Sequence, residues 1–233
     1  MAEPAKPTQL PFDLALTPGY TRDELVVTPA NAAAVAMIDR WPDWPSTAVL
    51  LAGPAGAGKS HLAAIWSDRA QALRVTPETI GEDVVLAATA GRPLLIDGVE
   101  GSLDETGLFH AWNAAREAGG HILLTSRRFP AAWRVRLPDL ASRLKTATIV
   151  EISEPDDLLL TAVLTKLFAD RQVQVEPHVV AFIANRIERS LATAMHIVDR
   201  LDAVAMARKT RISRALAAEI IGAADQGQGA LDF

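Results

Sequence analysis

Eight consecutive residues, Gly53 to Ser60, have the spacing of a phosphate-binding loop. They read Gly-Pro-Ala-Gly-Ala-Gly-Lys-Ser and match the pattern G-x-x-x-x-G-K-S at every fixed position. Glycines let backbone N–H groups approach phosphate oxygens, and a following helix turns its positive end toward the same anion. We therefore expect Lys59 to reach the β- and γ-phosphates of ATP or ADP, and the Ser60 hydroxyl to bind Mg²⁺.

Two further polar groups follow apolar runs. Pro93-Leu-Leu-Ile-Asp97 is a short run that ends in a carboxylate, which is typical of a strand that holds Mg²⁺ through water. His121 to Thr125 predicts another strand, and Ser126 follows it. Because the carboxyl ends of parallel strands meet at one edge of a sheet, we expect Asp97, Ser60 and either Thr125 or Ser126 to gather there.

The elements that position these groups alternate at first between strands and helices. Apolar runs predict strands at 47–52, 93–97, 121–125 and 148–152, with helices at 28–38, from 61 onward, at 104–118 and at 137–144, while 74–85 stays ambiguous. After Pro155 only helical patterns remain, at 156–170, 178–188, 190–208 and 213–222. The sequence thus predicts an α/β parallel-sheet domain at 19–153 and a small all-helical lid domain at 154–225, between an extended tail at 1–18 and a C-terminal tail at 226–233.

Composition narrows the class of protein. The 233-residue chain has a formal charge of −5, which argues against a general nucleic-acid coat protein. It has no cysteine, so disulfides and thiolate chemistry play no part. Neither a signal peptide nor an apolar run of about 18 residues is present, so we expect a cytoplasmic protein without membrane contact.

Five features together resemble a known family. They are the loop at 53–60, the acidic strand end at 93–97, Leu124-Thr-Ser-Arg-Arg-Phe-Pro130, the box Pro138-Asp-Leu-Ala-Ser-Arg-Leu144 and the helical C-terminal part. Over residues 20–225 the chain resembles an AAA+ ATPase of the DnaA clade. Within the clade it is most similar to the Hda-type regulators that promote inactivation of the initiator DnaA. An initiator continues past its lid into a helix-turn-helix domain, whereas this chain ends at Phe233, so direct reading of an origin is not expected.

The resemblance implies roles for individual residues. Arg143 matches the arginine finger, which acts in a neighbouring subunit's nucleotide site; the alternative is an ordinary surface arginine. Arg189 matches the sensor 2 arginine that reaches the chain's own phosphates from the lid, although Arg186 lies one helical turn away and could replace it. Val26, Val27 and Asn31 lie where the family closes around adenine. The nucleotide contacts expected from the motif and the family are Gly53, Pro54, Ala55, Gly56, Ala57, Gly58, Lys59, Ser60, His61, Val27, Asn31 and Arg189.

Departures from an active ATPase accompany these matches. After Asp97 the initiator has a second acid, where this chain has Gly98, and the initiator's acid after the sensor 1 strand is replaced by Arg127. Glu100 is the nearest remaining acid. Without an acid to orient the attacking water, phosphoryl transfer loses one of its recurring parts. We expect weak ATP hydrolysis by this chain alone, with bound ADP serving to order it.

The N-terminal tail suggests a partner. Gln9-Leu10-Pro11-Phe12-Asp13-Leu14 spaces a Gln and large apolar residues, and it matches the family's peptide for the β sliding clamp of DNA polymerase III, through Gln9, Leu10, Phe12 and Leu14. Alternatively these apolar residues pack on the chain's own core. The expected partners are therefore DnaA, the clamp and possible further copies of the chain.

Two function classes remain open. One is a clamp-tethered regulator that stimulates ATP hydrolysis by DnaA, and the other is a self-sufficient AAA+ ATPase such as a helicase loader. The basic residues between Arg127 and Lys145 are compatible with a solvated face, an initiator interface or contact with DNA phosphates.

Overall fold

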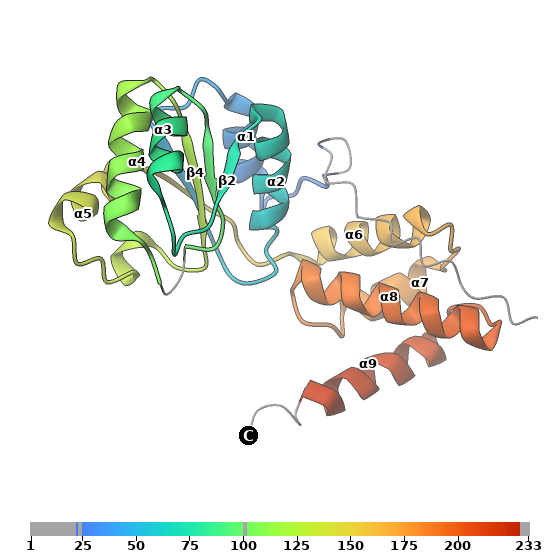
Figure 1. The fold of residues 1–233 in the computed structure, drawn as a ribbon. Helices are drawn as coiled ribbons and strands as arrows, with labels where there is room; N and C mark the ends of the chain where they lie inside the picture. The colour runs from blue at the N-terminus through green and yellow to red at the C-terminus, as the bar shows by residue number, and fades with distance from the viewer. Residues whose placement is uncertain (1–21, 23–24, 100–101, 229–233) are drawn as a thin grey trace, which may run out of the picture.

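The computed structural model describes residue 22, residues 25–99 and residues 102–228, with side chains up to 223. The predicted clamp peptide, with Gln9, Leu10, Phe12 and Leu14, lies outside the described residues, as do Glu100 and the last five residues of the chain. The described part forms a sheet domain followed by a helical domain (Figure 1).

Five parallel strands form the sheet, in the order β2-β3-β4-β1-β5. They are β1 (Ala48–Ala52), β2 (Leu73–Val75), β3 (Leu94–Ile96), β4 (Ile122–Ser126) and β5 (Thr148–Glu151). Every residue of β1, β3 and β4 is buried, as expected for parallel strands that are covered on both faces. Strand β1, between β4 and β5, leads directly into the predicted phosphate-binding loop.

Helices cover both faces of the sheet. On one face α1 (Ala32–Arg40) and α2 (Lys59–Ala70) pack with Val49, Leu51 and the fully buried Trp66. On the other face α3 (Glu82–Thr89), α4 (Glu105–Glu117) and α5 (Pro138–Leu144) pack with Leu50 and Trp112. The period-2 alternation along β1 therefore sends neighbouring side chains into two separate cores.

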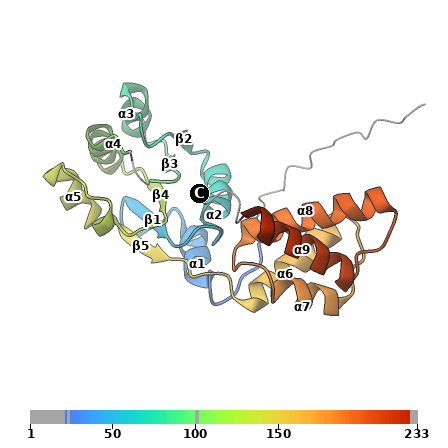
Figure 2. The same ribbon diagram turned by 90° about the horizontal axis from the view of Figure 1, so that it is seen from below.

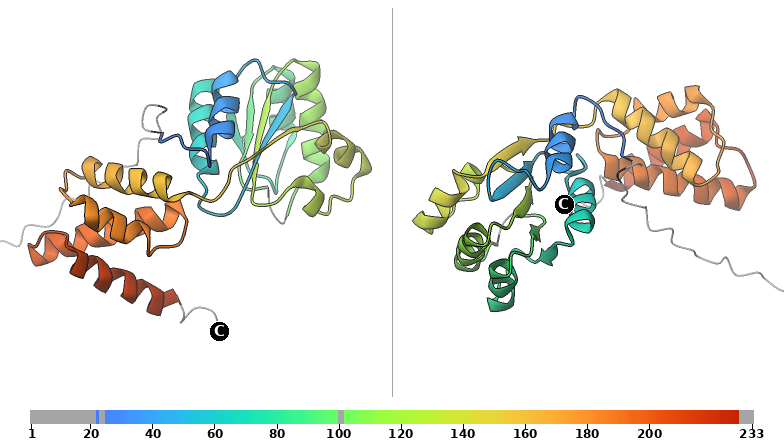
Figure 3. Two further views of the ribbon diagram at one scale, coloured as in Figure 1. Left: turned by 180° about the vertical axis from the view of Figure 1, so that it is seen from behind. Right: turned by 90° about the horizontal axis from the view of Figure 1, so that it is seen from above.

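The helical domain has a core of its own. It consists of α6 (Asp157–Asp170), α7 (Pro177–Ala184), α8 (Leu191–Arg208) and α9 (Arg214–Gln228), around residues such as Phe168, Ile183 and Leu201. It lies at the end of the sheet domain nearest α1 and α2, whereas α5 lies at the opposite end (Figures 1 and 2). The chain passes from β5 to α6 in one connection, which the view from behind makes visible (Figure 3).

These elements confirm the predicted fold class and refine several boundaries. The ambiguous stretch at 74–85 contains the end of β2 and the start of α3. The first helix begins at Ala32 rather than near Thr28, because the Asn31 side chain accepts from the backbone N–H of Thr28 and fixes a turn there. In the lid, α7 ends at Ala184 and α9 continues to Gln228, past the predicted end of the lid. Among the described residues no helix is long and apolar enough to cross a membrane.

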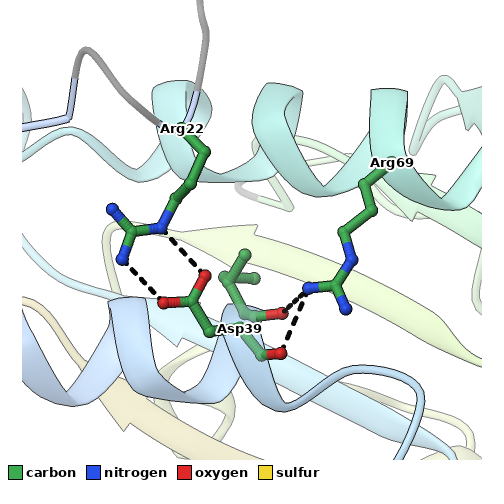
Figure 4. A network of polar contacts seen from close by, with 4 residues as sticks. Arg22, Asp39 and Arg69 are labelled. Carbon is green, nitrogen blue, oxygen red and sulfur yellow. Dashed lines mark hydrogen bonds and ion pairs between the residues drawn. The ribbon is translucent and has the colours of Figure 1, made fainter.

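A polar network fastens α1 to its surroundings (Figure 4). Arg22 donates to both carboxylate oxygens of Asp39, over 2.9 and 2.7 Å. The Arg69 guanidinium, from the last turn of α2, donates to the carbonyls of Ile38, Asp39 and Trp41. The hydrogen bond from Arg22 holds the pKa of Asp39 below its usual value. The network thus holds three elements together at one corner of the sheet domain: Arg22, α1 and α2.

An aromatic group lies beside this network, at the amino end of β4. Trp44 stacks on Trp66 with ring centroids 5.1 Å apart, and the His121 ring meets Trp44 edge-on at 5.4 Å. Burial lowers the pKa of His121 from its ordinary value of 6.5. The folded protein therefore resists protonation of this ring more than the unfolded chain does.

This pKa shift predicts a stability change with pH. The unfolded chain protonates His121 near pH 6.5, and the folded chain does so at lower pH. The contribution of His121 to stability is therefore full above about pH 6.5 and is lost as the pH falls below that value. In thermal melts between about pH 7.5 and 5.5, His121→Phe, which keeps an aromatic ring without the titrating group, should lose less stability than the parent protein. Equal pH dependence of the two proteins would contradict this expectation.

Candidate nucleotide site

The predicted phosphate-binding loop joins β1 to α2 and depends on its glycines. Gly56 and Gly58 have φ values of +70° and +93°, in the left-handed region that favours glycine. A Cβ on Gly53 would lie 2.2 Å from the backbone oxygen of Ile152, the residue directly after β5. The loop can therefore take this path only without side chains at these positions.

Lys59 points back into the loop. Its ammonium donates to the carbonyls of Gly53 and Pro54, over 2.8 and 2.6 Å, and the residue is only 8% exposed. A buried positive charge held by backbone carbonyls favours an anion nearby, and the loop that surrounds it belongs to the start of α2, whose dipole favours the same charge. These features fit phosphate oxygens.

The three strand-end and loop groups predicted to gather do lie together. Ser60 Oγ donates to Asp97 Oδ1 over 3.2 Å, and Thr125 Oγ1 donates to the same oxygen. Thr125 Oγ1 in turn accepts from the backbone N–H of Gly98 over 2.8 Å. A hydroxyl and a carboxylate are hard oxygen ligands of the kind that Mg²⁺ takes, together with phosphate oxygens and water. The residues therefore fit a Mg²⁺–nucleotide complex.

Ser126, the other predicted strand-end hydroxyl, has a different position. Because successive side chains of a strand point to opposite faces, it turns away from Asp97 when Thr125 turns toward it. Its hydroxyl donates to the Val99 carbonyl over 3.1 Å and accepts from the Trp133 indole N–H over 3.1 Å. Only its backbone carbonyl reaches the loop, where it accepts from Gly53 N–H over 3.1 Å. Thr125 is the one of the two that joins the site.

The lid touches the loop directly. The backbone N–H of Leu191 donates to the Gly56 carbonyl over 2.8 Å, and a Cβ on Gly56 would lie 2.0 Å from Ser190 Oγ. Ser190 caps α8, since its side chain accepts from Thr193 N–H. Ser190 and Leu191 are not among the residues predicted for the site, although a serine before an apolar helical run is a recognisable cap signal.

The two candidate sensor arginines have different surroundings. Arg189 directly precedes the lid contact and pairs with Asp157 over 2.8 Å, with about half of its side chain exposed. Arg186 stacks on the Phe182 ring, 3.9 Å from the ring centroid. Arg189 is therefore the arginine next to the loop, and Arg186 is engaged within the lid.

The predicted adenine contacts form a turn before α1. The buried side chain of Asn31 donates to the Val26 carbonyl over 2.9 Å and accepts from Thr28 N–H over 2.9 Å. Val27, between these anchors, is 47% exposed. Asn31 thus shapes the turn, and Val27 is the side chain that is open to a ligand. His61, in the first turn of α2, is half-buried.

The position after Asp97 carries no side chain. Gly98 has a φ of +77°, and a Cβ there would have no atom within 4 Å. There is therefore space for a side chain at this position, but glycine provides no second carboxylate. Arg127, the other departure from the initiator's pattern, is exposed after β4.

Arg143 lies in the last turn of α5, at the end of the sheet domain away from the lid (Figure 1). It is half-buried, and among the described residues no hydrogen bond or ion pair engages its guanidinium. The phosphate-binding loop touches the lid at the other end of the domain. Arg143 is therefore remote from the chain's own loop.

Sequence comparison relates the chain to initiators. No family model matches it. It is 30% identical over 243 residues to the chromosomal replication initiator protein DnaA of Thermomicrobium roseum, covering 90% of this chain and 51% of that protein. It is 27% identical over 233 residues to DnaA of Cutibacterium acnes, covering 88% of this chain and 46% of that protein. The chain thus spans about half the length of these relatives.

Solved structures share the fold. Domain III of Thermotoga maritima DnaA superposes with a TM-score of 0.74 at 21% identity, covering 87% of this chain and 95% of that one. AMPPCP-bound DnaA from Aquifex aeolicus gives 0.66 at 18% identity, covering 80% and 66%. The RuvB branch migration motor of Thermotoga maritima gives 0.63 at 20% identity, covering 83% and 66%. The chain is therefore similar in sequence to about half of DnaA, and it has the fold of DnaA domain III.

Proposed function

We propose that the protein is a nucleotide-binding regulator that stimulates ATP hydrolysis by DnaA and so limits initiation of replication. The observation that carries the proposal is the remoteness of Arg143 from the chain's own phosphate-binding loop, together with a guanidinium that no hydrogen bond or ion pair engages in the described part of the chain. An arginine in that position is available to a neighbouring molecule's nucleotide. Its position in the Leu-Ala-Ser-Arg-Leu box supports the same role.

The chain's own nucleotide site has a structural function in this proposal. Lys59 and the loop amides bind the phosphates of ADP or ATP. The Ser60 hydroxyl binds Mg²⁺, and the Asp97 carboxylate holds the same ion through water. Thr125 fixes the Asp97 carboxylate. Arg189 leaves its ion pair with Asp157 and binds the phosphates instead. Because Gly98 supplies no carboxylate, water is poorly activated and the bound nucleotide persists.

In this proposal the ATP that is hydrolysed is bound to DnaA. The tail with Gln9, Leu10, Phe12 and Leu14 binds a sliding clamp on DNA and raises the protein's effective concentration beside DnaA. Arg143 then enters the nucleotide site of DnaA and neutralises charge that develops in the transition state. This division of roles supplies the arginine from one protein and the hydrolysed ATP from the other.

Turnover measurements test the proposal against a self-sufficient motor. ATP hydrolysis should be slow with the protein alone and should rise when DnaA, clamp and DNA are all present, with the ATP bound to DnaA consumed. Rapid turnover by the protein alone, unchanged by DnaA, would favour a helicase loader or related motor instead.

Nucleotide binding by this chain is tested separately. ADP should stabilise the protein, by about 2.7 kcal/mol when its concentration is 100 times the Kd, because it binds only the folded state. Lys59→Ala should abolish this shift, since it removes the charge inside the loop. Lys166→Ala, which removes a lysine in the lid, is the control and should keep the shift. Scanning calorimetry with and without ADP gives the measurement, and an equal ADP effect in parent and Lys59→Ala would refute the assignment.

A further inference from the structure

Helix α5, which carries Arg143, is held to the domain mainly by one neighbour. Among the described elements it packs chiefly on α4, through the buried side chains of Leu140 and Leu144. The helix has only seven residues, and Leu137 at its N-cap makes no side-chain cap hydrogen bond. Because apolar contacts have no preferred direction, a short helix that rests on one apolar stripe can tilt about it. A fixed position of Arg143 therefore needs a second, directional contact.

Glu105, the first residue of α4, makes that contact. Its Oε2 accepts from the backbone N–H of Leu137 over 2.6 Å and from that of Arg136 over 2.9 Å. Its Oε1 accepts from Arg136 N–H over 3.0 Å. Both donors directly precede Pro138, which begins α5 and has no N–H of its own. A carboxylate from the neighbouring helix thus supplies the cap that the residues of α5 do not provide.

The end of α4 that presents Glu105 is itself fixed. One carboxylate oxygen of Asp104 accepts from Gly107 N–H over 2.9 Å, and the other accepts from Ile80 N–H over 3.2 Å. The N–H of Asp104 donates to the Pro77 carbonyl over 2.9 Å. Gly107 lies so close to this segment that a Cβ on it would be 2.4 Å from the Ile80 carbonyl oxygen. Glu105 therefore holds α5 from a rigid base.

We propose that Glu105 is a positioning residue for Arg143: it fixes the start of α5, so that the guanidinium enters the partner's nucleotide site in one orientation. This inference rests on the function proposed above. Among the described residues no hydrogen bond or ion pair fixes the Arg143 guanidinium, so its location depends on the backbone of α5. A misplacement of about 1 Å can cost about 10²-fold in rate. Loss of the Glu105 contact is therefore expected to lower stimulation.

Three substitutions separate this role from an effect of charge or of stability alone. Glu105→Ala removes the contact. Glu105→Gln loses the charge but keeps an oxygen that can take the place of Oε2, which accepts from both N–H groups. Glu105→Asp keeps the charge but is one methylene shorter, so its oxygens fall short of α5. The matched control is Glu117→Ala, which removes an exposed carboxylate from the other end of α4.

The first readout is ATP hydrolysis by DnaA on clamp-loaded DNA, titrated with the full chain of each variant. Glu105→Ala and Glu105→Asp should lower the maximal stimulated rate at least about tenfold, since both release the start of α5. The concentration for half-maximal stimulation should stay the same, because the tail is unchanged. Glu105→Gln and Glu117→Ala should keep most of the stimulation. Adding Glu105→Ala to Arg143→Ala should cause no further loss, because the two residues act as a unit.

The second readout needs no DnaA. Amide hydrogen exchange of residues 130–145, measured by mass spectrometry, should be faster than in the parent for Glu105→Ala and Glu105→Asp, because two N–H groups lose their acceptor. Glu105→Gln should exchange as the parent does. ADP should raise the melting temperature of all variants equally, which shows that the fold and the nucleotide site are intact.

The outcomes distinguish this inference from the function on which it rests. Normal stimulation by Glu105→Ala, with loss of stimulation by Arg143→Ala, would overturn the inference and leave the proposed function standing. Normal stimulation by Arg143→Ala would overturn both. The inference would also be wrong if Glu105→Gln lost as much as Glu105→Ala, if the double variant showed additive losses, or if exchange were unchanged in Glu105→Ala.

Discussion

Arg143→Ala should lower stimulation of DnaA's ATP hydrolysis by about 10³-fold or more, since an arginine finger supplied in trans contributes about 10³ to 10⁵ in rate. The substitution removes one half-buried side chain whose guanidinium makes no hydrogen bond or ion pair among the described residues, so the free energy of unfolding should change by no more than about 0.5 kcal/mol. ATP turnover by DnaA with clamp-loaded DNA gives the measurement. Lys145→Ala, at the exposed residue just after α5, is the neighbouring control and should keep stimulation.

A tail variant separates lost tethering from lost chemistry. Gln9→Ala with Leu10→Ala should also lose stimulation, because the effective concentration beside DnaA falls. Raising the protein concentration should partly restore that variant. No concentration can supply a missing guanidinium, so Arg143→Ala should stay inactive. Normal stimulation by Arg143→Ala at saturation would mean that the protein acts by rearranging DnaA's own residues.

Gly56→Ala should destabilise the protein by about 2 to 5 kcal/mol. The left-handed backbone at φ +70° costs a non-glycine residue about 1 to 2 kcal/mol. Overpacking adds about 1 to 3 kcal/mol, because the new Cβ would lie 2.0 Å from Ser190 Oγ. Chemical denaturation of the purified proteins measures the change. We also expect weaker ADP binding, since the clash separates the loop from the lid.

Gly119→Ala is the matched control for that substitution. Gly119 has a φ of +68°, and a Cβ there would meet no atom within 4 Å, so only the backbone term is present. Adding Ser190→Gly to Gly56→Ala should restore part of the loss, because it removes the clashing hydroxyl while glycine remains an acceptable helix cap. Equal destabilisation by Gly56→Ala and Gly119→Ala would show that the lid contact is unimportant.

The sequence predicted most of the fold because its strongest signals are local. The all-apolar run of β1, the glycines of the loop and the loss of strands after Pro155 each depend on neighbouring residues. The boundaries of α7 and α9 were less predictable, since helix ends depend on packing in the lid. Residues 74–85 stayed ambiguous because β2 has only three residues and one of them is buried.

The site was predictable where a motif fixes it and unpredictable where tertiary contacts do. Lys59, Ser60 and Asp97 follow from spacing, and parallel strands bring Thr125 to them. Which of Thr125 and Ser126 faces Asp97 depends on how β4 lies in the sheet. The contact of Ser190 and Leu191 with Gly56 joins residues more than a hundred positions apart, and no local pattern reports it. The stacking of Arg186 on Phe182, four residues before it, is by contrast a local contact.

The phosphate-binding loop contacts both domains. Gly53 lies against the Ile152 carbonyl, where the chain leaves the sheet for α6, and Gly56 lies against the cap of α8. One short loop therefore touches both the sheet domain and the cap of a lid helix, so a change in its shape would alter the contact between the two domains.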